Sequence, residues 1–381
     1  MTLCCAIIYI EVKMKIIHCA DIHADSKLGT HFTKEQADQR RKEIVDSFAN
    51  MVAFARDNDV KAIIIAGDLF DTKASQQKTI KKRFSYIISQ NPDIDFLYLR
   101  GNHDEDVEFA YEDNLPNLKR FSKDSWTCYS YGSVNIYGRE FGKSIPLTTY
   151  SELALDSSKI NILTLHGQVA DYKAKEGAPV ISLPHLTNKN IDYLALGHIH
   201  DFKLEKLDNR GSWAYSGCLE GRGFDECGQK GFVLLECDDN GGRTSGALEV
   251  KFIPFACRTI HELQVQLKGS EAYSEIMKEI SQAISSLPQK DIIQVDLTGE
   301  ISEETEIESS SYESALKSDF NFFYLRVKDK TERKINFEKY ENDVSLKGEF
   351  IRLVKENCDL SDEEKSKIIM TGIKALAGRL N

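Results

Sequence analysis

Five near-continuous apolar runs are the feature of this sequence that most restricts its fold. All of them lie between Lys15 and about Phe255, and they read "KIIHCA", "KAIIIAG", "DFLYLRG", "KINILTLHG" and "IDYLALGH". Such runs are typical of central strands that are covered on both faces. The segment from Gln36 to Asn58 instead repeats its apolar residues at the helical period. Strands that alternate with helices predict a layered α/β domain.

Each apolar run ends in polar residues of a kind that can bind a metal ion. The endings are "ADIH", "GDLFD", "GNHD", "HG" and "GHIH", in chain order. Loops that leave the carboxyl ends of strands converge at one edge of an open α/β sheet, so we expect these side chains to meet. Asp21 and His23 are two residues apart, as are His198 and His200. In extended backbone, the two members of each pair would point to the same side.

The pooled strand ends combine carboxylates, an amide and imidazoles without a thiolate. The set is Asp21, His23, Asp68, Asn102, His166, His198 and His200. This mixture suits one or two divalent ions of the manganese, iron or zinc kind. Two ions about 3.5 to 4 Å apart need a bridging carboxylate and ligands on each side, which the set can provide. A lone histidine beside an apolar run is more often structural, but five strand ends in this order favour a metal centre.

The ordered motifs resemble those of the calcineurin-like metallophosphoesterase superfamily, over roughly Met14 to Pro254. The stretches "HCADIHADSKLG", "DQRRKEIVDSF" and "IIAGDLFD" resemble DNA repair exonucleases of the bacterial SbcD type. The later "SGCLEGRGFDECGQKGFVLLE" is similar to the segment after the last metal motif in bacterial members. The resemblance implies a two-sheet sandwich flanked by helices. Protein phosphatases of the superfamily carry GDxxDRG and GNHE, and Thr72, Lys73 and "GNHD" argue against that class.

The same resemblance implies a role for each site residue. Asp21, His23 and His200 would hold a first metal, and Asn102, His166 and His198 a second, with Asp68 as the bridge. The two divalent ions expected are Mn²⁺, with Fe²⁺ or Zn²⁺ as alternatives. His103 would contact the scissile phosphate and be oriented by Asp104. Arg222, in "EGRGF", could contact a phosphate, and a solvated loop arginine is an equal alternative.

The function implied is cleavage of DNA in double-strand-break repair, as an exonuclease or endonuclease that uses a dinuclear metal-activated hydroxide. An SbcC-type ATPase is the expected partner, and a homodimer is also possible. The alternative is a phosphodiesterase for a small nucleotide or metabolite, without a partner. The net charge of −11 mildly favours this alternative because phosphate contacts need lysine and arginine. A scaffold without activity is a third option, against which the complete ligand set and His103 speak.

Several other residues are expected outside the metal centre. Asp25 is expected near the ligands without binding a metal, and His18 in the core or behind a ligand. His31, His185 and His261 have no motif context and are assigned to structure or surface. Cys218 and Cys227 could pair only if the fold brings them together. Nine cysteines without a CxxC pair or an export signal indicate reduced thiols, and no apolar stretch approaches membrane length. We therefore expect a cytoplasmic protein with no membrane partner.

Three parts are predicted along the chain: a phosphoesterase domain over 14–258, a small α/β domain over 259–342 and a helical segment over 343–381. Residues 1–13 precede Met14, which we take as a candidate initiator. The small domain is expected to hold a helix from Thr259 to about Ser286, the strands "DIIQVDLTG" and "NFFYLRVKD", and an acidic stretch, Glu300 to Ser311, that is either loop or charged helix.

The last segment reads as two amphipathic helices, the second capped by Ser361 with Glu364 three residues on. Each helix carries an apolar cluster that needs covering. One cluster is Phe350, Ile351, Leu353 and Val354, and the other is Ile368, Ile369, Ile373, Leu376 and Leu380. Docking of the ATPase and packing on the small domain are equally open ways to cover them.

Overall fold

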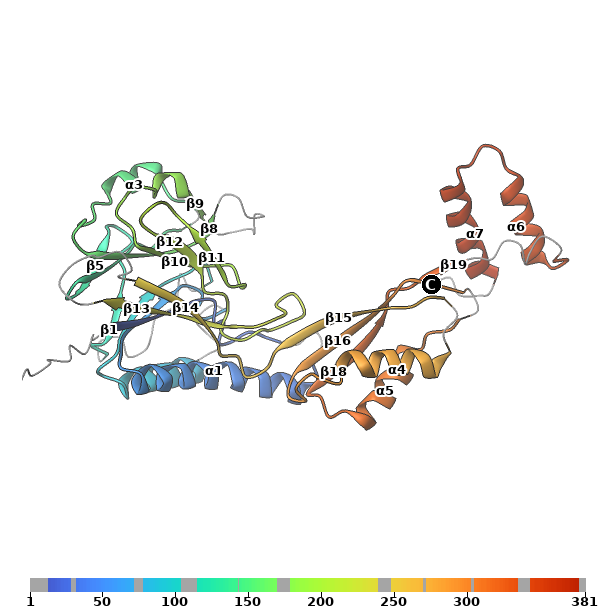
Figure 1. The fold of residues 1–381 in the computed structure, drawn as a ribbon, viewed down its shortest axis with the longest axis horizontal. Helices are drawn as coiled ribbons and strands as arrows, with labels where there is room; N and C mark the ends of the chain where they lie inside the picture. The colour runs from blue at the N-terminus through green and yellow to red at the C-terminus, as the bar shows by residue number, and fades with distance from the viewer. Residues whose placement is uncertain are drawn as a thin grey trace, which may run out of the picture. The chain divides into compact units, whose positions relative to one another are not determined.

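A computed structural model describes residues 13–28, 32–71, 78–103, 115–142, 144–169, 179–238, 248–269, 272–302, 305–334 and 343–376. The chain forms two compact units, residues 1–260 and 261–381 (Figure 1). The boundary lies two residues beyond the end of the first domain expected from the sequence. No helix in the described ranges combines the length and the apolar character needed to cross a membrane.

The first unit is built on two six-stranded sheets. One contains β1 (Lys13–Cys19), β2 (Val60–Ala66), β3 (Asp95–Leu99), β4 (Leu118–Arg120), β13 (Gly231–Asp238) and β14 (Leu248–Pro254), in the order β14-β13-β1-β2-β3-β4. The other contains β5 (Thr127–Tyr131), β6 (Val134–Gly138), β7 (Ile160–His166), β10 (Tyr193–Gly197), β11 (Lys203–Lys206) and β12 (Ser212–Tyr215), in the order β11-β12-β10-β7-β6-β5. The short strands β8 (Gln168–Val169) and β9 (Val180–Ile181) pair separately. The predicted two-sheet α/β architecture is confirmed.

The strands read as continuous apolar runs because both of their faces are buried. In β2, Ile64 points into the core between the two sheets, and its neighbours Ile63 and Ile65 point into the core on the outer side. Helix α1 (Lys34–Asp57) covers that outer side with Phe48 and is drawn along the sheet in Figure 1. Its first turn is closed by a capping box between Thr33 and Gln36.

Shorter helices complete this unit. Helix α2 (Lys78–Ser89) adds Phe84 and Ile88 to the core under α1. The outer face of the second sheet is covered by α3 (Leu147–Glu152) and the 3₁₀ turn η2 (Leu183–His185). Each sheet therefore buries apolar side chains on both of its faces.

The second unit has a three-stranded sheet formed by β15 (Ile260–Gln266), β16 (Ile292–Thr298) and β18 (Tyr324–Asp329). Helices α4 (Tyr273–Ile284) and α5 (Ser309–Asp319) pack on one of its faces (Figure 1). The short strands β17 (Glu300–Ser302) and β19 (Glu332–Lys334) form a second pair. The acidic stretch thus begins as a strand and ends in a helix, so neither description of it as a whole was right.

The helix predicted from Thr259 to about Ser286 is wrong in its first half, where β15 lies. Leu263, Val265 and Leu267 face the core and alternate with polar residues, which is the strand period. The alternation ends at Gly269, whose φ of +111° is accessible to glycine at little cost. The helical period is confirmed only from Tyr273 onwards.

The two C-terminal helices are confirmed as α6 (Leu346–Glu356) and α7 (Asp362–Leu376). Figure 1 shows them side by side as a hairpin, and Ile351 and Ile369 are buried in the cluster that joins them. The predicted cap is present, since Glu364 N donates to Ser361 Oγ (3.3 Å) and Ser361 N donates to the Glu364 carboxylate (2.9 Å). The two apolar clusters therefore cover each other in part.

Candidate metal centre

The strand ends of both sheets meet in one site. Asp21 and His23 follow β1, Asp68 follows β2, and Asn102 and His103 follow β3, all in the first sheet; His166 ends β7, and His198 and His200 follow β10, in the second. Main-chain hydrogen bonds join the first two loops, from Asp21 N to Gly67 O and from His23 N to Asp68 O, both 3.0 Å. The site therefore depends on the packing of one sheet on the other.

Backbone conformation at the site differs from the extended form assumed for the sequence pairs. Asp21, His23, Asp68 and His198 have φ values of +51°, +45°, +51° and +106°. Such values are uncommon for residues other than glycine and are typical of functional sites, where the surroundings hold them in place. One consequence is that His198 and His200 do not point the same way: they belong to two different ligand groups.

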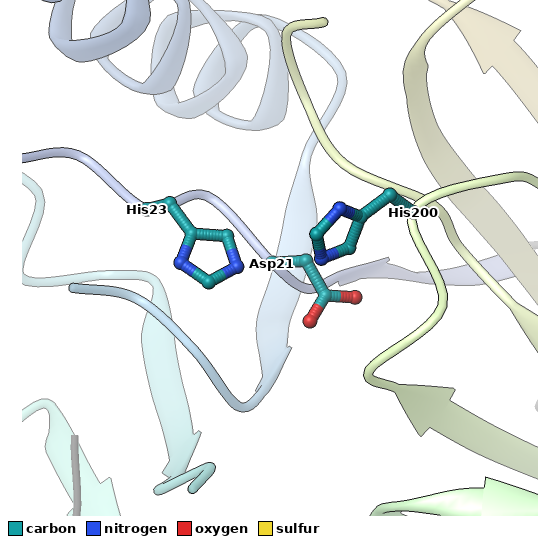
Figure 2. Close-up of side chains that lie close together, drawn as sticks. All are labelled: Asp21, His23 and His200. Carbon is teal, nitrogen blue, oxygen red and sulfur yellow. The ribbon is translucent and has the colours of Figure 1, made fainter. Parts of the chain in front are cut away.

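The first ligand group consists of Asp21, His23 and His200, whose ligand atoms all lie within 4.8 Å of one another. Figure 2 shows the Asp21 side chain between the two imidazole rings. Both Asp21 oxygens accept a hydrogen bond from His198 N at 2.9 Å. His200 Nδ1 is 2.6 Å from Glu226 Oε1, so Nε2 is the ring nitrogen that remains available to bind a metal ion.

The second ligand group consists of Asp68, His166 and His198, again within 4.8 Å. His166 Nδ1 is 2.9 Å from the carbonyl oxygen of Ala66. Its Nε2 is 3.0 Å from Asn102 Oδ1 and 3.4 Å from Asp68 Oδ2. Burial lowers the pKa of His166, but the charge and hydrogen bond of Asp68 outweigh burial and raise this pKa to about 10.

Two features of the groups fit divalent cations. If His166 donates from Nδ1 to the Ala66 carbonyl, its Nε2 lone pair faces two oxygens, which requires a proton or a cation between them. In the first group, His23 Nε2 is buried without a hydrogen-bond partner among the described residues and lies 3.9 Å from Asp68 Oδ2. Imidazole nitrogens facing carboxylate and amide oxygens are a ligand set for Mn²⁺, Fe²⁺ or Zn²⁺.

The glycines in the motifs make room for ligands that come from other motifs. A Cβ on Gly67 would lie 2.1 Å from His166 Nδ1, and one on Gly101 would lie 2.0 Å from Asp68 Oδ1. Position 67, in the motif GDLFD, must therefore be glycine to leave room for the side chain of His166. Position 101, in the motif GNHD, must be glycine to leave room for the side chain of Asp68. This interlocking explains why the motifs contain glycine directly before the ligand.

His103 lies beside both groups with its side chain 43% exposed. Its backbone N–H donates to Asp68 Oδ1 (3.0 Å), and its Nδ1 is 3.3 Å from Asp71 Oδ1. The hydrogen bond to Asp71 raises the pKa of His103 to about 9 against the effect of burial. Asp104, the expected partner of His103, lies outside the described residues.

Comparison with known families identifies this part of the chain. Residues 14–202 match the model of the calcineurin-like phosphoesterase family. They form a calcineurin-like phosphoesterase domain. The part of the chain that matches contains every predicted metal ligand, from Asp21 to His200.

Proteins similar to this chain include the DNA double-strand break repair protein Mre11 of two archaea. The protein from Methanosarcina acetivorans is 24% identical over 75% of this chain and 46% of its own length. The one from Sulfurisphaera tokodaii is 28% identical over 51% of each chain. The uncharacterized metallophosphoesterase YhaO of Bacillus subtilis is 27% identical over 58% of this chain and 57% of its own. The chain therefore spans about half the length of the curated relatives it matches.

Two carboxylates of the first unit were missed by sequence reasoning. Asp71 Oδ1 lies 3.4 Å from His23 Nδ1 as well as close to His103, and the three form a further group within 4.8 Å. Asp71 is the last residue of the motif GDLFD, and its place in this motif could have identified it. Glu226 contacts His200, and burial raises its pKa, but His200 and Arg222 outweigh burial and hold this pKa well below its usual range. No local pattern marks Glu226.

Arg222 is hydrogen-bonded to other residues of the first unit. Its Nη2 donates to Glu226 Oε1 (2.7 Å) and its Nη1 to Ser26 Oγ (2.9 Å). Ser26 Oγ in turn donates to Asp71 Oδ2 (2.9 Å). Arg222 thus links the two missed carboxylates, and the phosphate contact expected of it stays a prediction.

The remaining histidines and cysteines have structural surroundings. His18 is buried, its Nδ1 lies 2.9 Å from the Tyr193 hydroxyl, and burial lowers its pKa to about 3. His185 stacks on Tyr150 and His261 pairs with Asp291. His31 lies outside the described residues. No disulfide joins Cys218 to Cys227. Asp25 Oδ1 accepts a hydrogen bond from Asp71 N.

Proposed function

We propose that this protein is a metal-dependent phosphodiesterase that cleaves DNA in double-strand-break repair. The observation that carries the proposal is the meeting of two ligand groups around Asp68, with His103 exposed beside them. The phosphoesterase domain supports hydrolysis of a phosphate ester. The names of the Mre11 relatives support DNA as the substrate and break repair as the process.

In this proposal, Asp21, His23 and His200 bind one divalent ion, Asn102, His166 and His198 bind the other, and Asp68 serves both. Two Mn²⁺ ions bound there would neutralise charge on the phosphate and activate a water molecule near neutral pH. Asp71 holds the Nδ1 of His103, which leaves its Nε2–H free to donate a proton to the leaving oxygen. Asp104 is a further candidate for orienting His103.

We further propose an SbcC-type ATPase as the partner, docked on the helical segment 343–381. The net charge of −11 makes strong unaided binding to DNA unfavourable, so a partner would supply much of the affinity. Leu353 and Leu376 stay 62% and 47% exposed although α6 and α7 cover each other in part. Apolar helix faces of this kind fit a partner groove.

Hydrolysis assays with Mn²⁺ test the proposal on linear duplex DNA, single-stranded DNA and bis-p-nitrophenyl phosphate, with and without the ATPase. We expect cleavage of all three substrates, faster duplex cleavage with the ATPase and no activity with a chelator. Cleavage of the small diester without any cleavage of DNA, even with the ATPase, would favour the small-nucleotide phosphodiesterase. No cleavage of any substrate would favour an inactive scaffold.

A further inference from the structure

The two ligand groups differ in the kind of acceptor that faces the Nδ1 atom of an imidazole ring. In the second group, His166 Nδ1 faces a main-chain carbonyl, that of Ala66, at 2.9 Å. In the first group, His200 Nδ1 faces a side chain, the carboxylate of Glu226, at 2.6 Å. The acceptor for His166 is part of β2 and is fixed by the sheet, whereas the acceptor for His200 depends on the identity of one residue.

Glu226 is itself fixed in place. Glu226 is only 3% exposed, and both of its carboxylate oxygens accept hydrogen bonds from Arg222. The backbone N–H of Arg222 donates to Oε2 (2.8 Å), and Nη2 of Arg222 donates to Oε1 (2.7 Å). The Sγ of Cys218 lies 3.8 Å from Oε2. The carboxylate therefore cannot turn away from His200 without breaking these bonds.

A carboxylate so close to Nδ1 decides which nitrogen of His200 carries the proton. Arg222 Nη2 also lies 3.1 Å from Nδ1, but the carboxylate is nearer, at 2.6 Å, and can only accept, so Nδ1 donates and the lone pair of the ring lies on Nε2. Nε2 is the nitrogen available to the group formed with Asp21 and His23. Partners of this kind orient a ligand histidine, make it more basic and typically change metal affinity by about 10- to 100-fold.

We propose that Glu226 is a positioning residue that sets the affinity of the first metal group without affecting the second. The inference rests on the proposed metal-dependent function. It assigns a purpose to the buried pair of Glu226 and Arg222: the arginine holds the carboxylate against His200. Glu226 lies outside the segment, 14–202, that matches the phosphoesterase family.

The test is Mn²⁺ binding to the full chain by titration calorimetry, comparing the wild type with Glu226→Gln. In the variant, an amide replaces the charged acceptor, and its NH₂ must face either His200 or Arg222. We expect one of the two ions to bind 10- to 100-fold more weakly and the other to bind as in the wild type. The electron paramagnetic resonance spectrum at low Mn²⁺ should change from that of a coupled pair to that of a single ion.

The matched control is Asp192→Asn. Asp192 is also a buried carboxylate in a pair with an arginine, Arg210, but it precedes β10, at the end of that strand opposite to His198. We expect both ions to bind this variant with wild-type affinity. Equal weakening in both variants, or wild-type affinity for both ions in Glu226→Gln, would overturn the proposal.

A second variant covers the case in which Glu226→Gln does not fold. Glu226→Asp keeps the charge for Arg222 but withdraws the carboxylate from His200 by one methylene, and we expect the same selective loss. Wild-type binding of both ions by this variant overturns the role of Glu226. A wild type that binds fewer than two ions overturns the dinuclear centre and this role with it. If the variants show the expected selective loss of ion binding but the wild type does not cleave DNA, only the proposed substrate is overturned.

Discussion

Asp68 lies near a histidine of each ligand group. Its Oδ1 accepts from His103 N at 3.0 Å, and its Oδ2 lies 3.4 Å from His166 Nε2 and 3.9 Å from His23 Nε2. Burial raises the pKa of Asp68, but the surrounding histidines outweigh burial and hold this pKa well below its usual range. A charged carboxylate at this position can serve cations on both sides.

We expect Asp68→Asn to abolish hydrolysis and to lower the content of bound metal. Asparagine tolerates the φ of +51° at this position as readily as aspartate, so the effect comes from the lost charge. Metal analysis of the purified variant and its turnover of bis-p-nitrophenyl phosphate measure the two effects. A variant with two bound ions and wild-type turnover would show that the dinuclear interpretation is wrong.

His103→Ala should lower turnover without lowering the content of bound metal. The side chain of His103 is exposed beside the ligand groups, and its backbone N–H, which contacts Asp68, is retained in the variant. We expect an unchanged metal content and a turnover lower by about 10²- to 10⁴-fold, the range for lost acid–base assistance. A parallel loss of metal and activity would instead make His103 a ligand.

Only those residues of the candidate site that directly follow an apolar run were predictable from the sequence. Asp21, His23 and His200 were found because each follows an apolar run, and the structure brings them together. Asp71 and Glu226 act through contacts that form only in the folded chain, such as the 26-residue step from Glu226 to His200. The positive φ values, which send His198 and His200 to different groups, are not visible in spacing.

Among the strands and helices, the buried strands were the most predictable because both of their faces are apolar. The order of strands in the two sheets was not predictable, since β1 pairs with β13, which lies far along the chain. The strand β15 was misassigned because it directly precedes a true amphipathic helix, α4. Composition could not separate the two, but the alternation around Leu263 and Val265 could have.

Helix α1 is tied to the rest of the first unit by a buried charge network. Arg40 of this helix is fully buried and donates to Glu43 Oε2 (2.5 Å) and Glu220 Oε2 (2.9 Å). Glu43 also accepts a fork of hydrogen bonds from Arg258. Burial raises the pKa of Glu43, but Arg258 and Arg40 outweigh burial and bring this pKa below its ordinary value of 4.5.

We expect Glu43→Gln to destabilise the protein by about 3 kcal/mol at pH 7, because it leaves two arginines without their shared carboxylate. The pKa of Glu43 is lower in the folded state, so its ionised form contributes stability above pH 4.5, and this contribution is lost as the pH falls through the folded-state value. The difference between variant and wild type should therefore shrink in acid.

Urea unfolding at pH 7 and at acidic pH measures this difference. Glu249→Gln is the control, because Glu249 pairs with Lys13 and Lys251 at the surface and such pairs contribute little. We expect the control to match the wild type at both pH values. A Glu43→Gln difference that stays the same in acid would mean that the network is not held by the charge of Glu43.

For the chain as a whole, we expect that the C-terminal hairpin of α6 and α7 can be removed as one piece. The buried apolar side chains in its described part, Ile351 and Ile369, pack in a cluster formed by the two helices themselves. We expect a protein truncated after residue 342 to stay folded and to hydrolyse bis-p-nitrophenyl phosphate normally, but not to co-purify with the ATPase. Circular dichroism and co-purification with the intact chain as control make the test. Unfolding, or undiminished ATPase binding, would contradict the docking proposal.

The origin of the ligands in two different sheets has a thermodynamic consequence. Asp21 and Asp68 belong to the first sheet and His166 and His198 to the second, so bound cations would cross-link the two sheets. An ion at 100 times its dissociation constant would add about 2.7 kcal/mol to the stability of the folded state. The melting temperature should then rise with Mn²⁺ concentration and fall on chelation, and Asp68→Asn should lose most of this dependence. Heat resistance would thus report on the supply of metal.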